Sequence, residues 1–398
     1  MTGCLSKIPP YPQEMETWWW TKAVEKWPEA SESRILNLLR DEIVVQSDRF
    51  NKARDFSPAS YGSRDLSILA YGNFFFPRTW LQNTFVLAET MDLRGWKAPL
   101  KGPVRILDLG AGSDPAGLAT LRLLRERGIT NPIELRAVDY SSKSLARLTR
   151  IHADNVHLWP RPSVTTERID LSKALPNKSS HSYDLVLLSS SLNEIAEGRD
   201  SSQIAEDLVG ISESLKPSGF LIVVEPALKD TCDRLHLASS AIEVGSLHLH
   251  GPYFNGAPCP FVLSGARYHS HEVRRRKPPE IVRRLNQPIG LSVKDHKFGF
   301  ILISPKKPIS FDPGPSIIRL VSPVMKKKGI YSFVGIGGDA QERCYEIQIR
   351  DLRATHREFI GGLERGDVLL LRAWEAYEEG RRIRIPRPDA IEILWKPE

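Results

Sequence analysis

Val104-Arg-Ile-Leu-Asp-Leu-Gly-Ala-Gly-Ser-Asp-Pro-Ala-Gly117 is the stretch that decides the fold of this 398-residue chain. Its apolar run, Val104 to Leu109, is typical of a buried parallel strand. Gly110 and Gly112 follow this run. A turn built from glycines lets the backbone approach a ligand without interference from side chains.

The residues after the turn predict a capped helix. Ser113 or Asp114 is placed to accept hydrogen bonds from the first turn, and Pro115 suits the first helical position because its missing N–H is not needed there. The helix is expected to end near Gly128. A strand, a glycine turn and a capped helix in this order predict a nucleotide-binding corner.

The following sequence repeats the alternation of strand and helix. Ile133 to Asp139 is an apolar run that ends in an acid, and Ser141 or Ser142 then caps a helix. Further strands are predicted at 164–170, 183–190, 220–226 and 297–304. This alternation predicts an α/β fold with a doubly wound, Rossmann-like parallel sheet.

The series resembles the class I S-adenosylmethionine-dependent methyltransferases over residues 101–305. Five landmarks carry the resemblance: Asp108-Leu-Gly-Ala-Gly112, Asp139, Asp170, Tyr183-Asp-Leu-Val186 and Lys216-Pro-Ser-Gly-Phe220. A nicotinamide-binding Rossmann domain is the structural alternative. Its G-x-G-x-x-G pattern would place a glycine where Pro115 stands, so we favour the methyltransferase.

The resemblance implies S-adenosylmethionine as the cofactor. The residues that it assigns to the cofactor site are Asp108, Gly110, Ala111, Gly112, Asp139, Asp170 and Ser189. Asp139 is expected to accept hydrogen bonds from the ribose hydroxyls. Asp170 is expected either to reach the adenine amine or to cap a helix.

Ser189-Ser-Ser-Leu-Asn-Glu194 lies where methyltransferases receive the methyl acceptor. Asn193 and Glu194 are the candidate catalytic residues, although Glu194 could instead begin the next helix. Enzymes that methylate exocyclic amines of bases often carry an Asn/Asp-Pro-Pro-aromatic motif there, and this sequence lacks it. No general base stands out, because positioning of an acceptor beside a sulfonium methyl supplies much of the rate.

A second group of motifs is similar to the mitochondrial small-ribosomal-subunit methyltransferase-like family and its bacterial relatives. The motifs are Ala70 to Pro77, Ala257-Pro-Cys-Pro260, Arg267-Tyr-His269 with Arg274 to Lys277, Lys294 to Phe298, and Arg319 to Gly329. This resemblance implies that the partner is RNA, namely ribosomal RNA, or the small ribosomal subunit. It implies a role in ribosome biogenesis.

Members of that family commonly carry four cysteines as iron–sulfur ligands, and only Cys259 matches the pattern here. A cluster needs about four ligands, so we expect neither an Fe–S cluster nor another metal. Zinc bound by Cys259, His269 and His271 is an alternative without regular ligand spacing. Cys259 is also a candidate nucleophile, although its flanking prolines fit a rigid loop equally well.

The net charge of +7 is concentrated in one segment. Between Arg267 and Lys307 there are eleven Lys/Arg and three Asp/Glu. The RNA-binding candidates are Arg274, Arg275, Arg276 and Lys277. Interspersed histidines and aromatics favour RNA, where stacking accompanies phosphate contact, over a merely solvated surface.

Three regions are expected along the chain. Residues 1–100 form a helical N-terminal region, in which Trp18-Trp-Trp20 either anchors a small core or offers a stacking platform. The aromatic run that ends in Pro77 is predicted to break a helix and to lie near the mouth of the cofactor pocket. Residues 101–308 form the methyltransferase-like domain with a basic insertion at 255–296, and residues 309–398 form a β-rich domain that is either OB-like or a module that only packs on the core.

The composition predicts a cytoplasmic protein without a membrane association. No segment is long and apolar enough to span a bilayer, and the acidic N-terminus resembles neither a signal peptide nor a transit peptide. Four scattered cysteines indicate a reducing compartment. The leading hypothesis is an RNA methyltransferase, and the alternatives are a non-catalytic ribosome assembly factor and a methyltransferase acting on proteins or small molecules.

Overall fold

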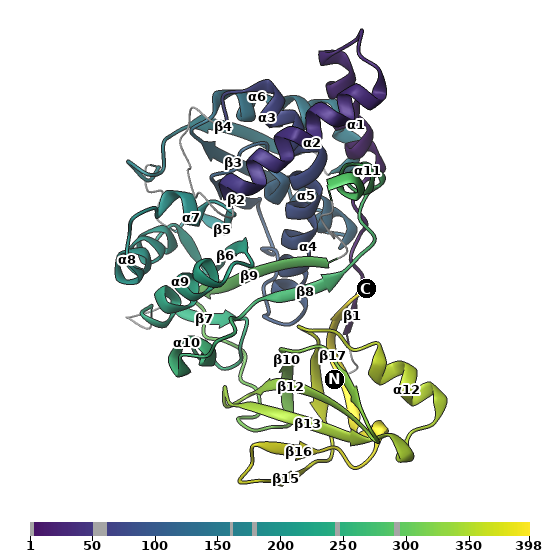
Figure 1. Cartoon of the computed structure of the whole chain (residues 1–398). Coiled ribbons are helices and arrows are strands. Elements are labelled where there is room, and N and C mark those ends of the chain that lie inside the picture. The colour runs from purple at the N-terminus through teal and green to yellow at the C-terminus, as the bar shows by residue number, and fades with distance from the viewer. Residues whose placement is uncertain (1–3, 51–61, 160–161, 177–180, 243–246, 290–294) are drawn as a thin grey trace.

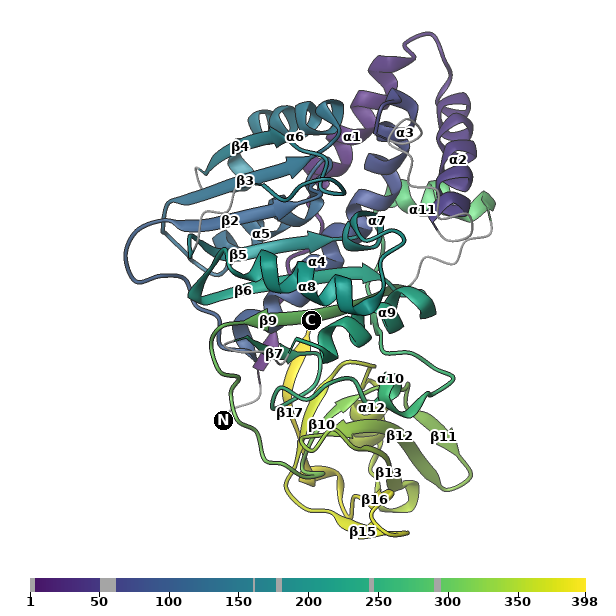
Figure 2. The ribbon, with the colours of Figure 1, turned by 90° about the vertical axis from the view of Figure 1, so that its left-hand side faces the viewer.

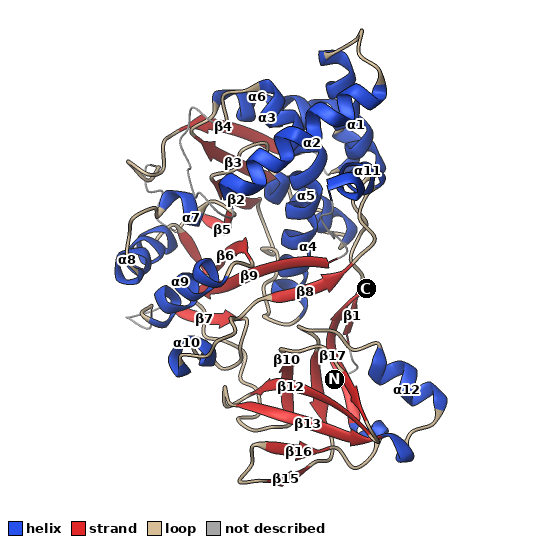
Figure 3. Cartoon of the chain, in the orientation of Figure 1, coloured by secondary structure: helices blue, strands red, loops and turns tan. Residues whose placement is uncertain are grey.

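The computed structural model describes residues 4–50, 62–159, 162–176, 181–242, 247–289 and 295–398 (Figure 1). Lys294, which contributes to the second resemblance, lies outside the described residues. Two β-sheets dominate the molecule, with most of the helices gathered around the first (Figure 3). No described helix is sufficiently long and apolar to cross a membrane.

The first sheet has the strand order β4-β3-β2-β5-β6-β9-β7 (Figure 2). Its strands are β2 (Val104–Leu109), β3 (Ile133–Asp139), β4 (Ser163–Arg168), β5 (Tyr183–Ser189), β6 (Leu215–Pro226), β7 (His248–Gly251) and β9 (Asp295–Ser304), and β8 (Glu272–Arg275) pairs with β9 off this path. Strands β2 to β6 are parallel, whereas β9 runs antiparallel between β6 and β7. This is the arrangement of class I methyltransferases, and it confirms the predicted fold class.

Side chains that alternate along the strands build one core on each face of this sheet. Ile106 and Leu185 belong to one core, whereas Leu107 and Val186 belong to the other. The first core is covered mainly by α4 (Phe76–Asp92), α5 (Pro115–Glu126) and α6 (Ser142–Asp154), and the second by α7 (Leu192–Ile195), α8 (Ser201–Ser212) and α9 (Lys229–Ser240). Both faces are buried, which explains the continuous apolar runs of the central strands.

The N-terminal region packs on the first core through α1 (Gln13–Lys26), α2 (Glu32–Asp48) and α3 (Asp65–Ala70). Trp19 is fully buried, and the indole N–H of Trp18 donates to Asp154 at 2.8 Å. A Cβ atom on Gly72 would lie only 2.1 Å from the Trp19 ring, so the backbone packs directly on the indole. Trp18 and Trp19 therefore anchor a core and do not form an exposed platform.

The expected break at Pro77 is wrong. Helix α3 continues into a π-helix, η2 (Tyr71–Phe75), and this leads directly into α4, where Pro77 occupies the first turn. A proline is tolerated at this position because its missing N–H is not needed. The wider π turn carries the aromatic run across the carboxyl edge of the sheet, and such turns are frequent at functional sites.

The second sheet contains a Greek key. The order β14-β10-β12-β13 places the fourth strand beside the first. Besides β1 (Cys4–Ser6), the strands of the second sheet are β10 (Ile317–Leu320), β11 (Met325–Lys327), β12 (Ile330–Gly337), β13 (Glu342–Gln348), β14 (Val368–Leu371), β15 (Glu375–Tyr377), β16 (Arg382–Arg384) and β17 (Ile391–Pro397). The remaining helices are α10 (Pro260–Ser264), α11 (Glu280–Asn286) and α12 (Ala354–Gly361), with short 3₁₀ turns at 156–158, 287–289, 349–351 and 388–390.

The beginning of the chain joins this second sheet. Strand β1 (Cys4–Ser6) pairs in parallel with β17, although the sequence placed these residues in a helical region. Among the described strands the pairing runs from β1 to β15 without closing into a ring. An OB-like barrel therefore stays a prediction.

Buried ion pairs join the two sheets. Arg319 of β10 lies 2.8 Å from Oε1 of Glu89 in α4 and 3.0 Å from Glu272 of β8. Arg94 contacts Glu89 at 2.6 Å, and all four side chains are less than a tenth exposed. Charges removed from water are tolerated only when paired, so this network fixes how the second sheet sits against α4 and β8.

Candidate functional site

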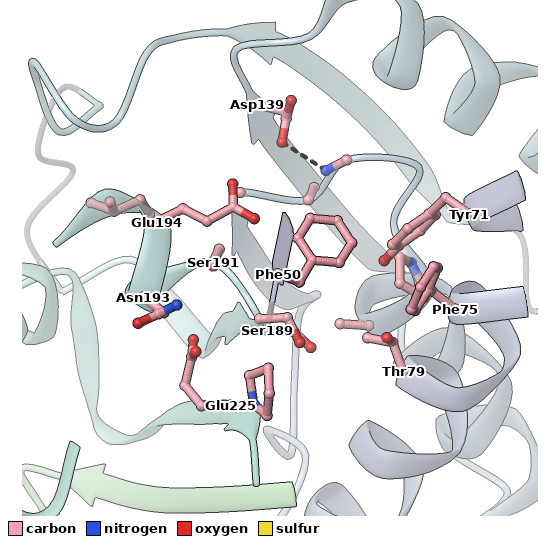
Figure 4. Close-up of a pocket in the computed structure, with 18 of the residues that line it drawn as sticks. Phe50, Tyr71, Phe75, Thr79, Asp139, Ser189, Ser191, Asn193, Glu194 and Glu225 are labelled. Atoms are coloured by element: carbon pink, nitrogen blue, oxygen red, sulfur yellow. Dashed lines mark hydrogen bonds between the residues drawn. The ribbon is translucent and has the colours of Figure 1, made fainter. Parts of the chain in front are cut away.

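A cavity of about 740 Å³ lies at the carboxyl edge of the first sheet, between the ends of β2, β3, β5 and β6 and the helical segment η2–α4 (Figure 4). Small-molecule sites are commonly about 300–1,000 Å³. Strand order reverses between β2 and β5, and open α/β sheets bind ligands at such a switch point. Position and size both indicate a cofactor and substrate site.

The two glycines of the turn after β2 have different roles. Gly110 has φ of +74°, and a Cβ atom there would lie 2.4 Å from Cβ of Ser191. Gly112 has φ of +55°, but a Cβ atom would meet no atom within 4 Å. Gly110 is therefore needed for packing between β2 and the segment after β5, whereas Gly112 leaves space on the cavity wall.

Asp139 is held at the end of β3 by two backbone amides. The Gly112 N–H donates to its Oδ2 at 2.9 Å, and the Ser141 N–H donates to its Oδ1 at 2.7 Å. Burial raises the pKa of Asp139 to about 6. Each carboxylate oxygen accepts more than one hydrogen bond, so Asp139 retains acceptor sites for a pair of ligand hydroxyls.

Asp108 and Asp114 form a buried acidic pair at the start of α5. Gly117 N–H lies 3.2 Å from Oδ2 of Asp108 and 2.5 Å from Oδ1 of Asp114, which is the helix cap. Burial raises the pKa of Asp114 to about 6, and burial and the neighbouring Asp114 raise the pKa of Asp108 well above its usual value. Asp108 lines the cavity, where its Oδ1 is buried without a hydrogen-bond partner.

Asp170 lines the cavity and also stabilises the turn after β4. Its carboxylate accepts from the Ser172 hydroxyl at 2.6 Å and contacts Lys173 at 2.7 Å. The hydrogen bonds from Lys173 and Ser172 hold the pKa of Asp170 below its usual value. Among the described residues no helix lies between β4 and β5, so Asp170 stabilises a turn and does not cap a helix, and the predicted contact with an adenine amine stays a prediction.

Two further carboxylates, those of Glu194 and Glu225, line the same cavity. Glu194 of α7 points into the cavity, where burial and then the charges of Asp139 and Glu225 raise its pKa to about 8 (Figure 4). Glu225, in β6, accepts a hydrogen bond from the Leu192 N–H at 3.0 Å, while its Oε2 is buried without a partner. Burial raises the pKa of Glu225 to about 8 as well.

Polar contacts also orient the two remaining predicted residues. The Ser189 hydroxyl accepts a hydrogen bond from the Asn83 amide of α4 at 2.7 Å. The Asn193 side-chain oxygen accepts one from Arg234 of α9 at 3.4 Å. All nine predicted cofactor and acceptor residues therefore line one cavity.

An aromatic wall faces these acids. Tyr71 and Phe75 of η2 stack with ring centroids 6.0 Å apart, and Phe50 meets Phe75 edge-on at 5.6 Å (Figure 4). The sequence predicts the aromatic run near the pocket, but no pattern indicates Phe50. Glu225 was also missed, although it ends a strand as Asp139 does, and that shared position could have identified it.

The structure separates the four RNA-binding candidates. Arg274 is buried, lies 2.7 Å from Asp367 and sits over the Trp395 ring at 5.1 Å. The prediction that Arg274 contacts RNA is wrong, because its buried guanidinium is already paired with Asp367. Arg275 and Lys277 are exposed, and Arg276 is half-buried.

The alternative zinc site of Cys259, His269 and His271 is not formed. Among the residues that the structure describes, no three His, Cys, Asp or Glu side chains are arranged to hold a metal ion. Cys259 is buried beside the Tyr253 hydroxyl, 3.8 Å away, and burial raises the pKa of its thiol. This environment disfavours a thiolate, which both a ligand and a nucleophile require.

Comparisons with known proteins give structural similarity only. No family model matches the chain, and no curated protein matches it in sequence. The CMeT domain of the citrinin polyketide synthase is 15% identical, with a TM-score of 0.35 over 75% of this chain and 81% of that chain.

Two further solved structures are comparably distant. A methyltransferase from Methanosarcina mazei is 16% identical (TM-score 0.28, 51% of this chain, 92% of that chain). The arsenic(III) S-adenosylmethionine methyltransferase of Chlamydomonas reinhardtii is 15% identical (TM-score 0.29, 61% and 80%). The fold assignment rests on the strand order of the chain itself, which is that of a class I methyltransferase.

Proposed function

We propose that the chain is an S-adenosylmethionine-dependent methyltransferase that acts on RNA. The observation that carries the proposal is the pairing of Gly112 with Asp139 on the wall of an acidic cavity at the switch point of the sheet. Six acidic side chains of the described residues line this cavity, namely Asp108, Asp139, Asp170, Glu194, Glu197 and Glu225. An acidic pocket favours S-adenosylmethionine, which carries a sulfonium and an ammonium group against one carboxylate.

The residues present fit this cofactor. Asp139 would accept hydrogen bonds from the ribose hydroxyls, while Gly112 leaves room for the methionine portion. Oδ1 of Asp108 is buried on the cavity wall without a hydrogen-bond partner, so it can pair with a polar group of the ligand. Glu194 and Glu225, whose pKa values of about 8 leave them mostly protonated at pH 7 in the free site, would ionise beside the cationic part of the cofactor.

The bound cofactor would supply an electrophilic methyl group, and the chain would supply position and proton transfer. The aromatic wall and α4 would exclude water and hold the acceptor in line. Glu194, with a pKa near 8, is suited to take a proton from an acceptor oxygen or nitrogen as the methyl group arrives. Asn193 and Glu225 would orient the α7 turn that carries Glu194.

An RNA acceptor is supported by the aromatic wall and by exposed basic residues. Phe50, Tyr71 and Phe75 offer ring faces of the kind on which unpaired bases stack. Arg275 and Lys277 would contact phosphates. A ribosomal RNA or small-subunit acceptor is implied by the resemblance to the mitochondrial small-ribosomal-subunit methyltransferase-like family, and we propose a cytoplasmic location from composition alone.

The proposal is tested by transfer of a radiolabelled methyl group from S-adenosylmethionine to total ribosomal RNA, with wild type beside Glu194→Gln. We expect incorporation into RNA that falls at least about 100-fold in the variant, since general base catalysis contributes about 10²–10⁴. A wild type that binds both ligands but transfers no methyl group would instead support the assembly-factor hypothesis. Methylation of co-purified protein but not of RNA would contradict the proposed acceptor.

A further inference from the structure

The charges around the cavity are not evenly distributed. The carboxyl edge of the sheet runs from β3 through β2, β5 and β6 to β9, which spans about 19 Å at a strand spacing of about 4.8 Å. Asp139 is the last residue of β3, and Glu225 is the residue before the last in β6. Among the described residues, the basic side chains that line the cavity are Arg78 and Lys297, and both lie at the β9 end.

Helix and strand geometry place both residues at the same end of the cavity. Arg78 and Gln82 are four residues apart in α4 and therefore share one face of the helix. The Gln82 amide donates to the backbone oxygen of Lys297 at 3.1 Å. Strand β9 is antiparallel to β6, and the pairing of Phe298 with Pro226 places Lys297 at the carboxyl edge.

Neither cation has an acidic partner among the described residues. Arg78 contacts the Phe74 ring at 5.6 Å, its Nε is buried without a hydrogen-bond partner, and burial lowers its pKa. A desolvated guanidinium without an anion is costly, so it indicates a place where an anion binds. Arg78 is half-buried, and the three fully buried arginines of the described residues, Arg94, Arg274 and Arg319, all have carboxylates.

The neighbouring His296 does not offset the positive charge of Arg78. His296 is fully buried beside Arg78 and Arg276, and burial followed by those two charges lowers its pKa to about 4. Neither ring nitrogen of His296 has a hydrogen-bond partner, so this neutral side chain contributes no counter-charge. The β9 end of the cavity is therefore cationic, whereas the β3 end is acidic.

We infer that Arg78 and Lys297 form an anion subsite at the α4–β9 end of the cavity, which holds a phosphate of the methyl acceptor. Arginine offers a planar fork that binds phosphate in a bidentate manner, and lysine adds a point charge at the entrance. A cationic cofactor at one end and an anionic acceptor at the other would enter without competing for the same charges. The assignment of the bound phosphate to a methyl acceptor rests on the proposed function.

The test uses the full chain saturated with S-adenosylhomocysteine, which is meant to block the cofactor end, and a fluorescein-labelled hexauridylate probe. Fluorescence anisotropy at several salt concentrations gives the affinity and the salt dependence. We expect Lys297→Gln to weaken binding at least about fivefold and to reduce the slope of log K against log salt by about 0.7, the value for one phosphate contact on a single strand. Arg78→Gln should weaken binding about tenfold, while Arg78→Lys should recover part of the loss.

Lys101→Gln is the matched control. Lys101 is exposed and precedes β2, so it lies at the opposite edge of the sheet. This control should bind the probe like wild type. Lys297 is exposed too, so Lys297→Gln is expected to fold even where Arg78→Gln does not.

Calorimetric titration of S-adenosylmethionine into every variant separates this inference from the proposed function. We expect unchanged cofactor affinity in all variants. Wild-type RNA affinity and salt slope in both Lys297→Gln and Arg78→Lys would overturn the anion subsite. A wild type that binds no cofactor, yet loses RNA affinity in the variants, would overturn the proposed function and leave the subsite standing.

Competition identifies the source of the phosphate. Uridine 5′-monophosphate should displace the probe better than uridine, because only the monophosphate offers the subsite its charge. The protein could instead bind the monophosphate but not hexauridylate, with affinity for the monophosphate reduced in the Lys297 and Arg78 variants. This result would support the subsite and assign it to a free phosphorylated molecule. Equal displacement by uridine and its monophosphate would overturn it.

Discussion

The Gly112 amide donates a hydrogen bond to Oδ2 of Asp139 at 2.9 Å, which joins the turn after β2 to the acid at the end of β3. The two residues are 27 positions apart, and parallel pairing of β2 with β3 brings them to the same edge. The glycine turn and the acid are therefore one preorganised unit. A ligand bound by Asp139 would therefore also lie beside Gly112.

Alanine at the two glycines should separate packing from binding. In Gly112→Ala the alanine must adopt a left-handed backbone conformation, although its Cβ atom meets no other atom. We expect this strain to lower stability by about 1–2 kcal/mol, and we expect the added methyl group to cause a clear loss of cofactor affinity. Gly110→Ala adds a collision with Ser191 to the same strain and should cost about 2–6 kcal/mol. Chemical denaturation and calorimetry measure both quantities.

The double variant Gly110→Ala with Ser191→Gly controls for that collision. Removal of the Ser191 Cβ should restore much of the stability lost in Gly110→Ala. If the double variant is no more stable than the single one, the collision does not account for the requirement for glycine.

Binding of a cation beside Glu194 should release protons at neutral pH. Burial and nearby carboxylates hold the pKa of Glu194 at about 8, so the group is mostly protonated at pH 7. A sulfonium close by favours the ionised form and lowers that pKa. Calorimetry in buffers of different ionisation enthalpy should show proton release on S-adenosylmethionine binding, and less in Glu194→Gln.

Glu225 also lines the cavity and has a pKa near 8, so Glu225→Gln is the comparison for this experiment. Proton release that persists in Glu194→Gln and vanishes in Glu225→Gln would assign the titration to Glu225. Proton uptake in the wild type would contradict the predicted sign.

The junction of the two sheets should depend on Glu89. Burial alone would raise the pKa of Glu89, but the charges of Arg319 and Arg94 outweigh it and lower the pKa below its usual value of 4.5. The ionised form is thus favoured by folding, and its contribution is present above that pH and lost as the pH falls further. Glu89→Gln leaves two buried guanidiniums poorly compensated and should cost about 3–5 kcal/mol by denaturant unfolding.

Glu379→Gln is the matched exposed control. The Glu379 and Arg381 side chains are 86% and 80% exposed, and their charged groups lie 3.5 Å apart. An exposed pair of this kind contributes less than about 1 kcal/mol to stability. A Glu89→Gln variant as stable as this control would show that the buried network does not hold the sheets together.

The sequence was informative where local pattern and tertiary structure agree. Val104 to Leu109, Asp114 and Asp139 form a strand, a helix cap and a strand-end acid as predicted, because apolar runs, capping residues and glycines act over short distances. The nine cofactor and acceptor candidates share one cavity for the same reason: the carboxyl ends of parallel strands meet at one edge.

The features that were missed depend on contacts between distant segments. The partnership of Arg274 with Asp367 spans 93 positions, and composition alone made that arginine look like a surface cation. The parallel pairing of β1 with β17 joins the two ends of the chain, which no periodicity reveals. The π turn at Tyr71 is likewise imposed by packing, since Gly72 must fit against Trp19.

The most direct measurement is calorimetric titration of S-adenosylmethionine into wild type and Asp139→Ala under identical conditions. We expect micromolar binding by the wild type, about −8 kcal/mol, because the site is already formed by the Gly112 and Ser141 amides. Loss of two hydrogen bonds to a charged group, each worth about 1.5–3 kcal/mol, should weaken the variant at least about 100-fold. Equal affinity in the two proteins, or no binding by the wild type, would contradict the assignment of this cavity to the cofactor.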